Sequence, residues 1–157
     1  MRSWDNSKNK GFCMRITTRG RYALRAALAL ARMGSDGTPI SINRLSEKEN
    51  ISSVFLEQIF FKLRKSGIVE SVRGPGGGFR FAKPLEELTV KTILDAAGEG
   101  LILSPCNIGK TSCGNINDCT SFAIWAEATT MVNNYFEGIT LASILNKYKS
   151  NRSCPVT

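Results

Sequence analysis

The sequence of 157 residues predicts a mainly α-helical fold with one small β-hairpin, followed by a long helix. Apolar residues recur at helical spacing over much of the chain. Residues 73–79 are rich in glycine and lie between two short apolar runs, residues 68–72 and 79–82, as is typical of a hairpin. The last long helical pattern is apolar on two faces. These observations indicate a helical core with an appended helix that must contact a further surface.

Composition and charge favour a folded chain with a polyanionic partner. Hydrophobic residues make up 42% of the sequence, which is enough for one core with a small appendage. The net charge is +8, and it is unevenly distributed: residues 1–90 contain 16 Lys and Arg against 8 Asp and Glu, whereas residues 91–157 contain 5 of each kind. A solvated basic surface would not predict this segregation, but binding to a polyanion would.

Neither a membrane segment nor a secretion signal is expected. No apolar run is long enough to cross a bilayer, and residues 1–10 are polar without the apolar region of a signal peptide. We therefore expect a cytoplasmic protein without membrane association. Because thiols stay reduced in that compartment, the five cysteines indicate metal or redox chemistry in preference to disulfides.

A first helix is predicted over residues 18–33, after a polar extension of residues 1–13. A threonine can cap its start, and a glycine follows its end. One apolar face of this helix is predicted to contain Leu24, Leu28 and Ala31. Another face carries three arginines that either stay solvated or contact phosphate: Arg21, Arg25 and Arg32.

Residues 41–65 are predicted to form a helix-turn-helix. Ser41 can cap the first helix, and Ser52 or Ser53 can cap the second, which continues to residue 65. The buried stripe of the second helix has i, i+3, i+4, i+7 spacing: Leu56, Ile59, Phe60 and Leu63. Its opposite side is predicted to carry Gln58, Lys62 and Lys65. The second helix of such a motif enters the major groove, where Gln can read adenine and Lys can read guanine or hold phosphate.

The glycine-rich stretch is predicted to be the tip of a hairpin, a wing that directly follows these helices. Proline fixes one turn angle, while glycines permit positive φ and a close approach of the backbone to a partner. Arg73 and Arg80 place positive charge on both sides of the tip. A helix-turn-helix followed by a basic wing is typical of winged domains that bind DNA. The predicted wing contacts are Arg73, Gly74, Pro75, Gly76, Gly77 and Gly78.

Three further helices are predicted after the wing. A short helix follows Thr89, a long helix covers about residues 118–136, and a final short helix covers residues 139–145. A helix that is apolar on two faces needs a second surface to cover it, and a two-fold homodimer is the economical explanation. Either of the two apolar faces of the long helix could face the partner. The candidate dimer residues are Trp125, Thr129, Val132 and Phe136.

Three cysteines lie close together in the loop before the long helix: Cys106, Cys113 and Cys119, with C-x6-C-x5-C spacing. Thiolates are soft ligands that suit iron–sulfur clusters or zinc. Structural zinc sites normally have pairs of cysteines with two to four residues between them, so the spacing favours a cluster. The chain contains no histidine, which leaves Asp118 as the leading candidate for a fourth ligand. Cys13 or Cys154 would qualify only if a terminal segment folded back.

These motifs resemble the IscR-like winged-helix regulators. The resemblance covers nearly all of residues 14–147. It is carried by residues 15–23, 51–52 followed by 56–60, 63–69, 71–79 and 138–141, and by the triple cysteine. It implies a homodimeric regulator of transcription that binds promoter DNA. The helix that begins near Ser53 would lie in the major groove and the wing in the minor groove. The three cysteines would hold an iron–sulfur cluster, of the 2Fe-2S type in most such members and 4Fe-4S as the alternative.

The chain departs from the pattern of this family at the cluster. The spacing between Cys106 and Cys113 is one residue longer than is common in the family. In addition, Phe122 occupies the position at which IscR-type members have a histidine ligand. Arg21 stands where some relatives supply a carboxylate. Family members usually begin near Met14. The predicted domains are residues 1–13 as an extension or mis-assigned start, 14–88 as the winged helix-turn-helix, 89–147 as the cluster loop and dimerisation helix, and 148–157 as a tail.

Two other functions compete with cluster sensing. The first is a DNA-binding repressor without a cluster, controlled by its thiols or by a partner protein. The second is an electron-transfer iron–sulfur protein, which would leave the glycine-rich wing without a purpose. An enzyme is not expected, because the sequence contains no histidine, no nucleophile–base pair and no nucleotide-binding motif.

Overall fold

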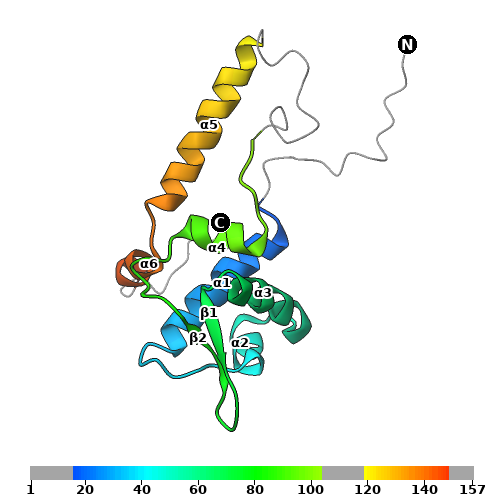
Figure 1. The fold of residues 1–157 in the computed structure, drawn as a ribbon, viewed down its shortest axis with the longest axis vertical. Coiled ribbons are helices and arrows are strands. Elements are labelled where there is room, and N and C mark those ends of the chain that lie inside the picture. The colour runs from blue at the N-terminus through cyan, green and yellow to red at the C-terminus, as the bar shows by residue number, and fades with distance from the viewer. Residues whose placement is uncertain (1–15, 104–118, 149–157) are drawn as a thin grey trace, which may run out of the picture. The chain divides into compact units, whose positions relative to one another are not determined.

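A computed structural model describes residues 16–103 and 119–148 of the chain (Figure 1). Within these residues the chain forms two compact units, one made of residues 16–100 and 135–148 and the other of residues 101–103 and 119–134. The first is called the winged-helix unit below, and the second the long-helix unit. The described helices are too short or too polar to span a membrane.

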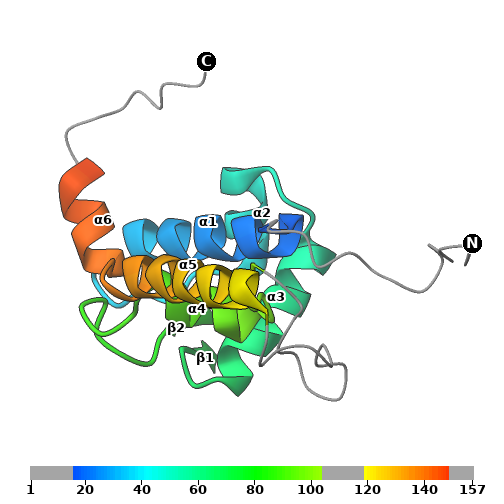
Figure 2. The same cartoon turned by 90° about the horizontal axis from the view of Figure 1, so that it is seen from above.

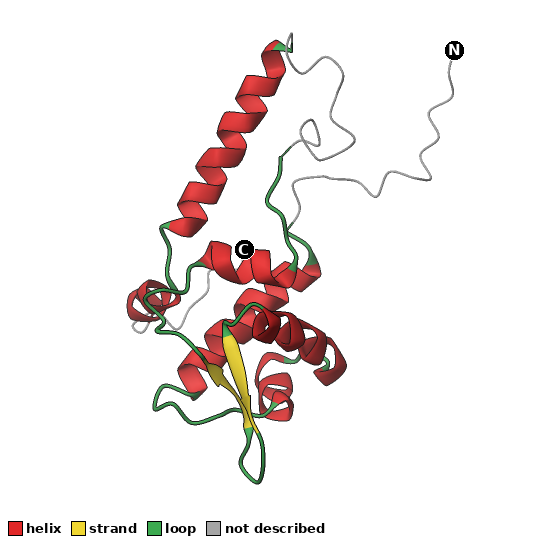
Figure 3. Cartoon of the chain, viewed as in Figure 1, coloured by secondary structure: helices red, strands yellow, loops and turns green. Residues whose placement is uncertain are grey.

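The winged-helix unit contains five helices and a two-stranded hairpin within its described residues (Figure 3). The helices are α1 (Thr18–Met33), α2 (Ile42–Glu49), α3 (Ser53–Lys65), α4 (Val90–Ala97) and α6 (Leu141–Tyr148), and the strands are β1 (Val69–Val72) and β2 (Gly78–Phe81). Helix α1 is central, because it contacts each of the other four helices (Figures 1 and 2). The predicted fold class, mainly α with a small β-hairpin wing, is confirmed.

The central position of α1 follows from its alanines. Its core-facing residues are mostly small: Gly20, Ala23, Ala26, Ala27, Ala29, Leu30 and Ala31. Of the three residues predicted on one apolar face, Ala31 is buried, and Leu24 and Leu28 are partly buried and pack against the core. Small side chains let several neighbouring helices approach the α1 backbone closely, so alanine and not leucine occupies the most crowded side.

The start of α1 is anchored by Glu99, which follows the end of α4. Thr17 is the N-cap residue, as expected, but its side chain makes no capping hydrogen bond. Instead, the Thr17 hydroxyl donates to the carboxylate of Glu99, and the Thr17 amide donates to the same group at 3.2 Å. Glu99 is only 7% exposed. A buried carboxylate beside a helix N-terminus is favoured by the helix dipole as well as by these bonds.

The helix-turn-helix has the predicted capping and core. The Ser41 hydroxyl accepts a hydrogen bond from the Arg44 amide at 3.3 Å, and Asn50 ends α2 in the left-handed conformation. Ser52 is the N-cap residue of α3, although its side chain makes no capping bond. The predicted buried stripe of α3 is confirmed, with each residue at most 1% exposed: Leu56, Ile59, Phe60 and Leu63.

The wing is an antiparallel hairpin that a third backbone segment extends. In the hairpin Val69 pairs with Phe81 and Val72 with Gly78. Ile40, which precedes α2, forms a bridge to Phe79 with two backbone hydrogen bonds of 2.9 Å. A Cβ at Gly78 would lie 2.3 Å from the backbone of Ile40, so only glycine permits this approach. The bridge fixes the base of the wing to the start of the helix-turn-helix.

Helices α4 and α6 belong to the same unit as the wing. The Thr89 hydroxyl caps α4 by accepting from the Thr92 amide at 3.1 Å, and Gly98 ends that helix at positive φ. Leu141, at the start of α6, is fully buried in the same core, and the flanking backbone bonds Val90 to Ile139 and Leu141 to Leu88 at 2.8 Å.

The described part of the long-helix unit is most of α5 (Thr120–Glu137) with residues 101–103. No residue of α5 is fully buried, and its large apolar side chains are exposed: Ile124, Trp125, Met131 and Tyr135. The Leu103 amide donates to the Thr129 hydroxyl at 3.2 Å, and the Asn133 amide group donates to the Leu101 carbonyl at 3.1 Å. These bonds fix the segment that enters the cysteine loop along the middle of α5.

Candidate nucleic-acid interface

The outward face of α3 lies opposite its buried stripe and is fully accessible. Because α3 contacts α1, α2, α4 and β1 through its buried side, nothing in the described residues covers the other side. Ser53 lies at the start of this helix and is half-buried. The exposed residues along the outward face are Val54, Glu57, Gln58, Phe61, Arg64 and Lys65.

The helical pattern predicts Lys62 on this face together with Gln58 and Lys65, but in the structure its side chain turns towards α4. Its side chain is half-buried, and its ammonium donates a hydrogen bond of 3.0 Å to the carbonyl of Ala97. That carbonyl is one of the unpaired acceptors at the C-terminal end of α4, where a positive charge also suits the helix dipole. Lys62 therefore links α3 to α4 inside the winged-helix unit.

The wing tip combines an exposed arginine with an unusual backbone. Arg73 and Pro75 are exposed, and Gly74 and Gly76 adopt positive φ angles of 104° and 75°. A Cβ at Gly77 would lie 2.3 Å from the Val72 carbonyl oxygen. The predicted glycines are thus needed to form the tip itself, whatever the tip contacts.

The second arginine of the wing is paired. Arg80 Nε donates to Glu70 Oε1 at 2.6 Å across the hairpin, and both side chains are about half exposed. Arg64 Nη1 lies 3.4 Å from the Ser71 hydroxyl, which connects α3 to β1. The charge at Arg80 is therefore partly neutralised by its own hairpin, while Arg73 remains at the tip.

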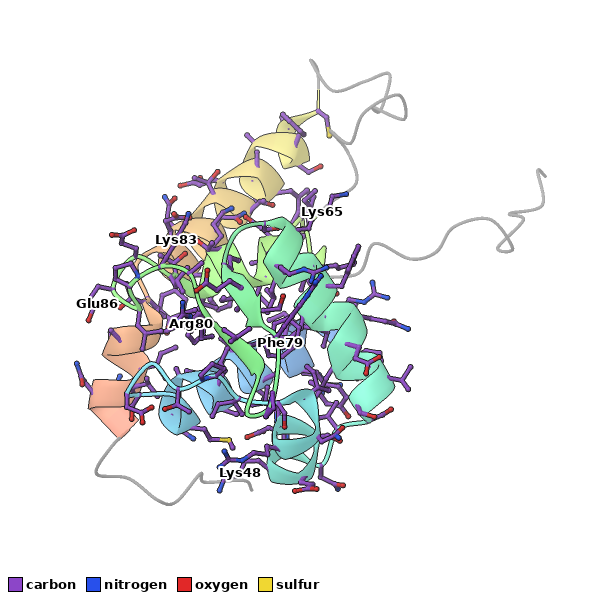
Figure 4. The ribbon with its side chains drawn as sticks, turned by 60° about the horizontal axis from the view of Figure 1, so that its bottom comes forward. Lys48, Lys65, Phe79, Arg80, Lys83 and Glu86 are labelled. Atoms are coloured by element: carbon purple, nitrogen blue, oxygen red, sulfur yellow. The ribbon has the colours of Figure 1, made fainter. Side chains whose placement is uncertain are left out.

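Basic and acidic side chains both occur on the side of the unit that carries α2, α3 and the wing. Figure 4, which brings this side forward, shows Lys48 from α2, Lys65 from α3, and Arg80 and Lys83 from the wing and the loop after it. The sequence predicts three arginines on one face of α1. The Arg25 guanidinium is paired with Glu49: its Nη2 lies 3.0 Å from the Glu49 carboxylate and donates to the Glu49 backbone carbonyl at 2.7 Å. Arg21 donates to the Thr18 hydroxyl at 3.3 Å, and Arg32 is exposed.

One of the three predicted cluster ligands is described. Cys119 directly precedes α5, and its Sγ lies 3.1 Å from the Ser121 hydroxyl. Hydrogen bonding from the Ser121 hydroxyl, and then from the Phe122 backbone amide, lowers the pKa of the Cys119 thiol. Cys106, Cys113 and Asp118 lie outside the described residues, as do Cys13 and Cys154. Among the residues with described positions, no three potential metal ligands come together.

The predicted dimer residues lie along α5 with different degrees of exposure. Trp125 is 47% exposed, while Val132 and Phe136 are half-buried. The Thr129 hydroxyl is occupied, because it donates to the Trp125 carbonyl at 2.7 Å and accepts from Leu103. Thr129 therefore has a structural role within its own unit.

Sequence reasoning did not identify Val54, Phe61 and Arg64 as surface residues of α3. The signal was present, since Val54 and Phe61 are four residues before and three residues after Gln58 and thus share its face. Apolar residues on a predicted helix are normally assigned to the core, which hides those on the opposite side.

The chain is similar to known regulators of transcription over most of its length. The family model Rrf2, described as an iron-dependent transcriptional regulator, matches residues 16–147. An HTH-type transcriptional regulator of Haemophilus influenzae is 39% identical over 139 residues, which cover 88% of this chain and 91% of the relative. The HTH-type transcriptional regulator IscR of Yersinia pseudotuberculosis is 38% identical over 133 residues, covering 85% and 80%. The solved structure of T. potens IscR has a TM-score of 0.70 and 25% identity, and covers 90% of this chain and 93% of that one.

Proposed function

Because this chain belongs to the Rrf2 family and is therefore a DNA-binding regulator of transcription and not an enzyme, we propose that it acts at promoters as a cytoplasmic homodimer controlled by an iron–sulfur cluster. The observation that carries the DNA-binding mode is the accessible outward face of α3 beside the glycine-tipped wing. Helix α3 would enter the major groove and the wing the adjacent minor groove.

In this mode the residues of α3 and of the wing have different tasks. Gln58 is exposed and can form two hydrogen bonds with an adenine edge, and Ser53 at the helix start can bind phosphate or a base. Arg73 would enter the minor groove, and the backbone from Gly74 to Gly78 would lie against the sugar–phosphate chain. Lys62 supports α3 from behind through its bond to α4.

Arg73→Ala and Gln58→Ala test this docking. We expect each substitution to weaken specific binding by about 1–3 kcal/mol, and the Gln58 variant to relax the preference at one base position. Competition binding on a selected duplex measures both effects. Lys91→Ala, which removes one positive charge from α4, outside the helix-turn-helix and the wing, is the control for Arg73. Unchanged affinity in both Arg73→Ala and Gln58→Ala would exclude the proposed docking.

The proposed homodimer uses α5. An 18-residue helix without a single buried residue exposes Trp125 and other large apolar side chains to solvent, and a second copy of α5 would cover them. The candidate contacts remain Trp125, Thr129, Val132 and Phe136.

The proposed cofactor is an iron–sulfur cluster held by Cys106, Cys113 and Cys119, with 2Fe-2S as the expected type and 4Fe-4S as the alternative. The described donor fits, because a lowered pKa increases the thiolate form that binds iron. A bound cluster would supply sensitivity to iron and oxidants. Asp118 is the proposed fourth ligand. Anaerobic purification followed by iron, sulfide and zinc analysis and a visible spectrum tests this site.

Cysteine variants make that experiment specific. Cys119→Ser is expected to abolish the visible absorbance, whereas Cys154→Ser in the tail is expected to leave it unchanged. A finding of stoichiometric zinc without sulfide would contradict the sensor proposal and indicate a structural metal site.

A regulator that senses oxidants directly through its thiols is the second candidate. The lowered pKa of Cys119 favours it, because the thiolate is the form that oxidants attack. Absence of both metal and sulfide after anaerobic purification would support this candidate over the cluster.

A further inference from the structure

Two large apolar side chains, Val54 and Phe61, project from the outward face of α3. They are 63% and 59% exposed, respectively, although the buried stripe on the opposite side already supplies the contacts of α3 with the core. The only contact described for the Phe61 ring is with the Arg64 guanidinium, 5.9 Å from the ring centroid. Neither side chain is therefore explained by the packing of the winged-helix unit.

The neighbours of these two residues indicate what kind of surface they meet. Glu57 and Gln58 lie between them along the face, and Arg64 and Lys65 follow. A helix that docks into a protein groove presents a continuous apolar stripe, whereas here the apolar residues are separated by charged and amide side chains. A major groove matches this mixture, since base edges offer hydrogen-bonding groups together with one apolar group, the thymine methyl.

We propose that Val54 and Phe61 recognise the 5-methyl groups of two thymines in the major groove, so that both residues determine sequence specificity. This inference rests on the proposed docking of α3. Val54 lies in the first turn of α3, the part of a recognition helix that contacts base edges, and its β-branched side chain has few rotamers to lose on binding.

The spacing requires two different thymines. Val54 and Phe61 are seven residues apart, which is two helical turns, or about 10 Å along the axis. One methyl group cannot contact both side chains over that distance, and successive base pairs are separated by only about 3.4 Å. Phe61 also lies beside Arg64, whose guanidinium is 5.9 Å from the ring centroid and whose Nη1 lies 3.4 Å from the Ser71 hydroxyl, so the edge of the Phe61 ring stays open for contact with the methyl.

The test removes single methyl groups from the DNA. Duplexes that the full-length dimer selects from a random library are synthesised with each thymine replaced in turn by uracil, which lacks only the 5-methyl group. We expect two positions in each half-site at which the replacement weakens binding about fourfold, the effect of about 0.8 kcal/mol for one buried methyl-sized group. Val54→Ala should remove the sensitivity at one of these positions, and Phe61→Ala at the other.

Val54→Ile is the matched control, because it keeps an apolar β-branched side chain and should still prefer thymine. Equal affinity for the thymine and uracil duplexes at every position would overturn the inference. A preference for thymine that persists unchanged in both alanine variants would overturn it too, since the methyl would then be read elsewhere. Failure of the wild-type dimer to select any duplex would instead contradict the proposed function. Circular dichroism confirms that the variants are folded, as expected for exposed positions.

Discussion

Gly78 lets two backbone segments meet at a distance that any side chain would prevent. Its position pairs β2 with Ile40, and this bridge holds the wing against the start of the helix-turn-helix. The wing is therefore not a free hairpin: a two-stranded hairpin alone is marginally stable, and the third segment provides additional pairing. One glycine thus sets the position of the whole wing.

Gly78→Ala should destabilise the fold by about 1–3 kcal/mol, because the new Cβ must displace the Ile40 backbone. Urea denaturation followed by circular dichroism measures the difference in the free energy of unfolding. Lys83→Ala, at an exposed position in the loop after β2, is the control and should change this free energy by less than about 0.5 kcal/mol. Equal stability of the two variants would show that the bridge does not constrain the wing.

Cys119 should react as a thiolate at lower pH than an ordinary cysteine. Its folded-state pKa is lowered, chiefly by the Ser121 hydroxyl, so the thiolate is already populated below the usual range and is lost as the pH falls through the lowered value. Alkylation of the metal-free protein by iodoacetamide across pH, read by mass spectrometry of the Cys119 peptide, gives the midpoint. Ser121→Ala should raise that midpoint, and identical profiles for the two proteins would contradict the assigned cause.

Helix α5 differs from the other helices in how many of its apolar side chains are exposed. Its apolar residues occur on two faces, and none of them is buried within the described structure. The other helices each place an apolar side against α1 or its neighbours. This contrast is the reason for proposing α5 as the dimer contact.

Val132→Asp is expected to shift the dimer towards monomer, because a charge without a partner would be buried in the contact. Sedimentation velocity at micromolar concentration measures the change. Thr130→Asp places the same charge at an exposed position of the same helix and should leave the dimer intact. A wild-type chain that sediments as a monomer at this concentration would contradict the assignment.

At the level of elements, most of the fold could be predicted because caps and periodicity are local properties. Ser41, Thr89 and Gly98 mark helix ends by bonds to nearby backbone, and the α3 stripe follows from spacing alone. The side of α1 that is most buried could not be predicted, since it depends on how closely four other helices approach. The bonds of Lys62 to Ala97 and of Arg25 to Glu49 join residues 35 and 24 positions apart, which no local pattern encodes.

The features of the candidate site also divide into those that local sequence predicts and those that depend on tertiary structure. The wing and the helix-turn-helix could be predicted because glycine spacing and helix periodicity are local sequence patterns. The pairing of Arg80 with Glu70 could not, because it depends on the register of the hairpin. The exposure of Val54 and Phe61 becomes evident only when the opposite side of α3 is seen to supply the core contacts.

For the molecule as a whole, the distribution of charge predicts strong dependence of DNA affinity on salt. The excess of Lys and Arg lies within residues 1–90, which include the helix-turn-helix and the wing. Each phosphate neutralised by a basic residue releases a counterion, so the logarithm of the binding constant should fall linearly with that of the salt concentration, with a slope of about −0.9 for each phosphate contact. Fluorescence anisotropy on one duplex gives this slope.

Arg73→Ala should reduce the magnitude of the slope by about one if the guanidinium contacts a phosphate, and leave it almost unchanged if it contacts a base. A wild-type slope near zero would contradict an interface built on basic residues.

The burial of Leu141 in the core of the winged-helix unit has a consequence for synthesis on the ribosome. The chain leaves that unit after Gly100 and returns to it at Tyr135, so the winged-helix unit is discontinuous in sequence. A nascent chain that has emerged only as far as the cysteine loop lacks α6 and exposes the surface that Leu141 covers. The unit can close its core only after the cysteine loop and α5 have been translated. Premature termination within α5 would therefore leave the winged-helix unit incomplete, although its helix-turn-helix and wing would be intact in sequence.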